Sequence, residues 1–328
     1  MKKVLLSLGM IVFVGGVVAG ATGAFFSDTE TSTGNTFAAG SLDLKVDSEA
    51  HYNGATCIPN ANQIPEVEGD EFVWDDGSEV GWPIAGTPCD GTWAETDLGV
   101  GTTFFNLTDV KPGDEGENTI SLHVYDNNAW GRFVIDNVES NDNTCTEPES
   151  DPLVVDPECN AESDTDLNNG EGELAETINF FVWLDQGSDP GFQCNDANSV
   201  DEGDACTNDP TEGDNIQQET EPTLVTPGGV DPLGETHNIW LGLAAVRAAT
   251  LGCAAADPDG DGNNQAAGVY NSCHGLATDG RMVGSVTYYF GLGWDTDDVG
   301  NEAQTDSLEA DLVFEVEQHR NNTTPFAP

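Results

Sequence analysis

The chain has 328 residues, enough for one large domain or two small ones, and a formal net charge of −52 at pH 7. Its 60 acidic residues against 8 basic ones create a field that repels nucleic acid and anionic membrane surfaces, so we expect neither as a partner. Two compatible explanations of the acidic excess remain. The surface is adapted to molar salt, in which charges more than ~3 Å apart are screened from each other, or its carboxylates are partly neutralised by calcium.

The chain begins with the pattern of a secretory signal. Two lysines precede an apolar run over residues 4–21, and small residues follow it. We predict cleavage after Ala24, so that residues 1–24 are a signal peptide and the exported chain starts at Phe25. The protein is therefore expected to be secreted and extracellular, with no membrane attachment after cleavage.

Residues 25–37 have strand-forming threonines but little apolar surface and no obvious partner in the chain. The alternation of threonine with polar residues suits an extended backbone. Such a segment gains stability mainly by pairing with the edge of an existing sheet. The next stretch differs, because Leu42, Leu44 and Val46 alternate with charged residues and predict a half-buried strand.

The rest of the chain reads as strands joined by long loops. We predict strands over 102–107, 177–184, 281–293 and 307–318, a hairpin over 118–138, and a short helix over the Ala-rich residues 239–251. Since no βαβ rhythm occurs, these elements predict an all-β fold, a β-sandwich within residues 38–328.

Two stretches of this domain, residues 139–176 and 185–236, are acidic and rich in Asn, Gly and Pro. No Lys or Arg occurs between Phe133 and Val246, and such composition alone is typical of disorder. Because both stretches lie between predicted strands, we interpret them as long acidic insertions in the loops of the sandwich.

Eight cysteines behind a secretory signal predict disulfides rather than a metal site. The chain contains no C-x-x-C spacing, which disfavours zinc. Pairing of sequence neighbours gives the candidates Cys57–Cys89, Cys145–Cys159, Cys194–Cys206 and Cys253–Cys273.

One acidic turn has the spacing of a calcium loop. Asp257, Asp259, Asp261 and Asn263 alternate and could place several oxygens around one ion. Gly268 stands where an EF-hand has its bidentate Glu, so a solvated acidic turn explains these residues equally well. We predict at most a structural calcium.

The sequence offers no constellation for catalysis. It contains neither H-E-x-x-H nor G-x-S-x-G, and its five histidines are scattered. We therefore predict no catalytic residue, no cofactor for chemistry and no enzyme activity.

Three stretches carry a resemblance to a known family. They are GAFFSDTETSTGNTFAAGSLDL at the signal junction, NLTDVKPGD over 106–114, and NEAQTDSLEADLVFEVEQHRNN over 301–322. Together they resemble the TasA/camelysin family of secreted biofilm-matrix fibre proteins, and the last stretch resembles its acidic archaeal members. The resemblance implies a jelly-roll sandwich and processing by a dedicated signal peptidase.

The resemblance also implies assembly by donor-strand exchange, in which residues 25–37 of one subunit add a strand to the next. The main partner is then a second copy of the chain, in a homopolymer. Minor fibre subunits are expected as further partners. The donor-strand candidates are Phe25, Phe26, Thr29, Thr31, Thr33 and Phe37.

Two alternatives are monomeric cell-surface proteins. Camelysin-like proteins have been classed as metallopeptidases, so one alternative is a peptidase. The other is a carbohydrate-binding module that stacks sugars on Trp74, Trp82 and Trp93, although packing of the predicted Cys57–Cys89 loop explains these tryptophans as well.

Overall fold

The computed structural model describes residues 27–31, 42–61, 71–78, 80–99, 102–107, 109–125, 127–146, 149, 159, 172–188, 190–192, 209–228, 236–250, 274–296 and 302–327. The elements in chain order are β1 (Ser27–Thr31), β2 (Asp43–Tyr52), β3 (Ala55–Pro59), β4 (Phe72–Trp74), β5 (Trp93–Thr96), β6 (Glu115–Tyr125), β7 (Ala129–Asn141), α3 (Leu174–Thr177), β8 (Ile178–Leu184), β9 (Thr223–Gly228), β10 (Thr236–Asn238), α4 (Ile239–Ala249), β11 (Thr287–Thr296) and β12 (Ser307–Gln318). Among these residues, no helix is long and apolar enough to span a membrane.

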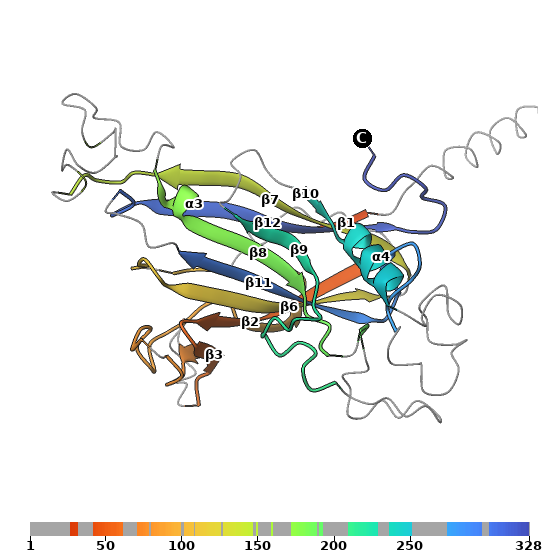
Figure 1. The fold of residues 1–328 in the computed structure, drawn as a ribbon, viewed down its shortest axis with the longest axis horizontal. Helices are drawn as coiled ribbons and strands as arrows, with labels where there is room; N and C mark the ends of the chain where they lie inside the picture. Colours follow the sequence, from red (N-terminus) through yellow and green to blue (C-terminus); the bar gives the residue numbers. More distant parts are fainter. Residues whose placement is uncertain are drawn as a thin grey trace, which may run out of the picture.

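The strands form two antiparallel sheets, which confirms the predicted β-sandwich (Figure 1). The small sheet has the order β1-β12-β7-β10, and the large sheet has the order β4-β3-β2-β6-β11-β8-β9, with β5 paired to β2. The chain crosses between the sheets from β1 to β2, from β6 to β7, from β7 to β8, from β9 to β10, from β10 to β11 and from β11 to β12. Frequent crossing of this kind is what jelly-roll sandwiches show.

Two predicted elements are absent from the structure, and the strand predicted over 281–293 is β11, which begins only at Thr287. The predicted hairpin over 118–138 is wrong, because β6 pairs with β2 and β11 in the large sheet whereas β7 pairs with β12 and β10 in the small sheet. Residues 102–107 form a loop rather than a strand. In both cases apolar alternation identified buried residues, but alternation does not say which strand lies beside which.

The core lies between the sheets, where alternate residues of each strand meet. In β2, Leu44 and Val46 are fully buried, and in β12 Phe314 and Val316 are almost so. Phe133 of the small sheet packs on Phe180 of the large one, with ring centroids 6.2 Å apart. Burying one such side chain stabilises the fold by about 1.5–3 kcal/mol.

The predicted short helix is α4, which packs beside β7 and β10 at one end of the small sheet (Figure 1). Its buried Leu243 and Val246 face the sandwich, whereas Leu241 is 59% exposed. A second helix, the single turn α3, was not predicted, because four residues give no periodic signal.

Candidate functional site

One side of β12 is only partly paired. The other side pairs with β7 from Ser307 to Gln318, with one register shift between Glu309 and Asp311. On the open side, β1 pairs antiparallel with β12 from Val313 to Glu317 only, so the segment around Thr29 does have a partner in its own chain. Within the described residues, no strand pairs with this side of β12 between Ser307 and Leu312.

The unpaired half of β12 borders a groove of about 1470 Å³ between the two sheets. Leu308 and Ala310 are only half-buried there, whereas Leu312, further along the strand, is 7% exposed. The groove is larger than the ~300–1,000 Å³ of most small-molecule pockets. Its apolar lining includes Phe104, Phe105, Leu107, Val110, Leu174, Ile178 and Phe180.

The loop before β6 forms one wall of this groove. Phe104 anchors it, because its ring lies 4.9 Å from that of Trp93 and 5.9 Å from that of Phe314. The following turn is held by Asp114, whose carboxylate accepts hydrogen bonds from the Tyr52 hydroxyl at 2.7 Å and the Lys111 N–H at 2.8 Å. The NLTDVKPGD motif therefore shapes the groove through a buried carboxylate.

Asp306 holds the opposite wall. Its Oδ2 accepts hydrogen bonds from the N–H groups of Glu173 and Leu174, at 2.6 and 3.1 Å, and so fixes α3 beside the start of β12. Burial, assisted by repulsion from the nearby carboxylates of Asp142 and Glu149, raises the pKa of Asp306 to about 6. The position of this wall therefore depends on an acidic residue that titrates near neutrality.

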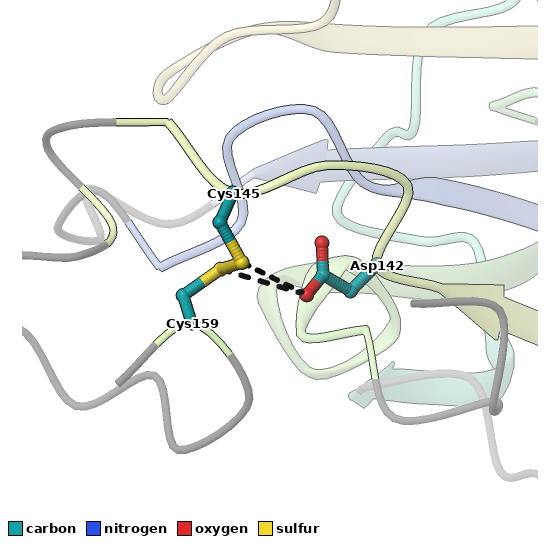
Figure 2. A group of neighbouring side chains, drawn as sticks. All are labelled: Asp142, Cys145 and Cys159. Atoms are coloured by element: carbon teal, nitrogen blue, oxygen red, sulfur yellow. Dashed lines mark hydrogen bonds between the residues drawn. A yellow bond between two sulfur atoms is a disulfide. The ribbon is translucent and has the colours of Figure 1, made fainter. Parts of the chain in front are cut away.

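Asp142 lies against a disulfide rather than in a metal site (Figure 2). Cys145 and Cys159 are bonded to each other, and the Asp142 Oδ2 approaches their sulfurs at 3.9 and 3.6 Å. In the described part of the chain, these three side chains are the one group of three His, Cys, Asp or Glu ligands within 4.8 Å of one another. Because disulfide sulfurs offer no thiolate, the group does not fit a metal ion.

A serine, a histidine and an aspartate meet on the outer face of the large sheet, which the sequence did not indicate. His123 Nε2 lies 2.9 Å from Ser121 Oγ and 3.2 Å from Asp47 Oδ2. In a catalytic triad the acid contacts the other ring nitrogen, and the serine is accessible to substrate. Here Ser121 is 1% exposed and also bonds Asp47 directly, so the three residues form a structural network across β2 and β6.

Part of the second acidic insertion packs on the same outer face. Asp185 accepts hydrogen bonds from the N–H groups of Gly213 and Asn215, and Glu221 accepts from those of Gly187 and Gln218. Burial raises the pKa values of both Asp185 and Glu221. These buried carboxylates bind residues 209–221 to the end of β8.

The structure places only some of the predicted site residues. Thr29 and Thr31 lie in β1, and the Cys57–Cys89 and Cys145–Cys159 disulfides form as the order of the cysteines predicts. The remaining candidates lie outside the described residues: Phe25, Phe26, Thr33, Phe37, Cys194, Cys206, Cys253, Cys273, Asp257, Asp259, Asp261 and Asn263.

Comparison with known proteins agrees with the N-terminal resemblance. The family described as camelysin metallo-endopeptidase matches residues 1–60, which include the signal-like segment, β1 and β2. No curated protein matches the chain. The ligand groups in the described residues do not fit the metal that this family description implies.

Proposed function

We propose that this chain, which shares the N-terminal segment of the TasA/camelysin family, is the structural subunit of an extracellular filament. In this proposal, residues 25–37 of one exported copy pair with the open side of β12 in the next. The contact joins two different surfaces, so its repetition produces an open, head-to-tail polymer. The role is structural rather than enzymatic.

The observation that carries the proposal is the edge of β12 from Ser307 to Leu312, with which no strand among the described residues pairs. An unpaired strand edge beside an apolar groove is a template for another chain, and soluble proteins normally cover or charge such edges. Here β1 covers positions 313–317, and positions 307–312 line the groove. The edge therefore has room for a strand longer than β1.

Within one chain, a strand that kept the β1 register could not extend as far as Ser307 and still reach β2. If it continued along β12, Phe37 would lie opposite Ser307. Asp43 is fixed opposite Tyr125, close to the Gln318 end of β12, because Tyr125 precedes the start of β7 by four residues and Ala129 pairs with Gln318. The six steps from Phe37 to Asp43 span at most about 20 Å, whereas the eleven from Ser307 to Gln318 span about 36 Å.

A second copy has no such restriction. Its residues 32–37 can follow β12 to Ser307, because their connection to β2 belongs to another molecule. Six more paired residues add main-chain hydrogen bonds of about 0.5–1.5 kcal/mol each and fill the apolar groove. The intermolecular strand is therefore longer and better covered than β1, which favours exchange.

Truncation tests the proposal. Removal of residues 25–35 from the exported chain deletes β1, but β12 keeps its full pairing with β7. We expect a folded monomer with a near-native circular dichroism spectrum that forms no filaments by negative-stain electron microscopy. A truncated chain that still assembles like the full one would show that this segment is not the connecting strand.

A synthetic peptide of residues 25–37 provides a second test. It carries the strand but no acceptor edge, so we expect it to bind the truncated monomer and to stop the growth of full-length filaments. A peptide with the same composition in scrambled order serves as the control. If both peptides act alike, recognition of the strand sequence is excluded.

A further inference from the structure

We infer that the strand donated by a second copy pairs with β12 one residue out of register from β1, so that Ser32 rather than Thr31 lies opposite Val313. This inference rests on the proposed function, because it concerns the contact between copies. It deepens that proposal by defining which residues of the incoming strand meet the groove.

The pairing of β1 with its own chain matches unlike residues. Asp28 lies opposite Val316 and Glu30 lies opposite Phe314, although both β12 residues belong to the core. Thr29 in turn lies opposite Glu315. This register therefore pairs acidic residues of β1 with apolar positions of β12.

The same register would also place no large apolar residue opposite the apolar positions in the open half of β12. Continued toward Ser307, it would set Ser32, Gly34 and Thr36 opposite Leu312, Ala310 and Leu308. None of these three donor residues has a large apolar side chain, whereas the groove they would enter is lined by aromatic and aliphatic residues.

A shift of one residue exchanges the two faces of a strand completely. With Ser32 opposite Val313, the groove positions receive Thr33, Asn35 and Phe37, and Phe37 lies opposite Leu308. Leu174 and Ile178 line the groove there and supply an apolar site for the ring. A shift in the other direction would instead place Phe37 beyond Ser307, where β12 begins. Only the shift that sets Ser32 opposite Val313 therefore places the Phe37 ring at the groove.

The favoured shift has an electrostatic consequence. It sets Glu30 opposite Glu315 and Asp28 opposite Glu317, and like charges directly opposite each other destabilise a sheet. Arg132, which is bonded to Glu315, offsets part of this repulsion, and molar salt screens charges beyond ~3 Å. Assembly in this register is therefore favoured by salt.

Disulfide cross-links between cysteines introduced into separate copies identify the register directly. One copy carries Val313→Cys, and a second carries Thr31→Cys, Ser32→Cys or Glu30→Cys, so any cross-link between the two is intermolecular. Only residues directly opposite each other bring their Cβ atoms to the ~3.5–4.5 Å that a disulfide requires. A single chain with both Thr31→Cys and Val313→Cys serves as the control, because its monomer should close the bond internally.

The expected result is that the Ser32→Cys copy cross-links to the Val313→Cys copy in filaments with a yield at least about tenfold above the other two, because residues on opposite faces cannot form the bond. A dominant Thr31 or Glu30 cross-link would overturn the register while leaving strand exchange intact. Filaments that give no cross-link from any of the three would overturn both the register and the proposed function.

Discussion

A negative charge placed in the groove should block assembly while leaving the monomer intact. Ala310 is suited to this test, because it is half-buried at the open edge of β12 and points toward the groove. In the monomer, the carboxylate of Ala310→Asp keeps contact with water, and charges on edge strands are well tolerated. We therefore expect the free energy of unfolding to change by at most about 1 kcal/mol.

In the filament, the same carboxylate would be covered by the incoming strand. Removing an ion from water without a partner costs several kcal/mol in proteins. If partial hydration at the edge reduces this to about 3 kcal/mol, the concentration needed for assembly rises about a hundredfold, since each 1.4 kcal/mol is a factor of ten.

Sedimentation of filaments over a range of protein concentrations, in molar salt, measures this threshold. Thr324→Asp is the matched control, because it adds the same charge at an exposed position beyond the end of β12. Thr324→Asp should assemble like the unsubstituted chain. Equal thresholds for both variants, with both folded, would refute the assignment of the groove to the incoming strand.

Three further predictions concern the stability of the monomer. Burial, followed by repulsion from nearby carboxylates, raises the pKa of Glu117 to about 8, so the folded state holds a proton that the unfolded state releases. The free energy of unfolding should therefore fall as the pH rises from about 5 to 8. Urea titrations should show that Glu117→Gln flattens this dependence. The Cys145–Cys159 disulfide closes a short loop, so Cys145→Ser with Cys159→Ser should lower the free energy of unfolding by up to about 3 kcal/mol, and an unchanged urea midpoint would contradict this. The net charge of −52 predicts a melting temperature that rises from low to molar sodium chloride, and a value indifferent to salt would disprove the role of self-repulsion.

Local patterns in the sequence were sufficient for elements whose burial follows a simple period. The alternation from Leu308 to Val316 identified β12 with its bounds, and the Ala-rich run after Asn238 identified α4. The pairing of strands depended on information that alternation lacks. β6 and β7 are close in sequence yet lie in different sheets, where β6 pairs with β2 and β11 and β7 pairs with β12 and β10.

The groove was still harder to predict, because it is formed by segments far apart in the sequence. Its walls come from the loop after β5, from α3 and from the start of β12, and Asp306 joins two of them through backbone hydrogen bonds. The N-terminal threonines predicted a strand that pairs with the edge of a sheet, but nothing in their pattern identified β12 as that edge. A buried acid such as Asp306 has no sequence signature among 60 acidic residues.

The most direct test of the central claim is a high-resolution electron cryomicroscopy reconstruction of filaments grown from the exported chain in molar salt. The account predicts a continuous strand along β12 from Ser307 to Glu317 that traces back to the N-terminus of the neighbouring subunit. It would be contradicted by filaments in which every subunit keeps β1 on its own β12 and neighbours meet through another surface.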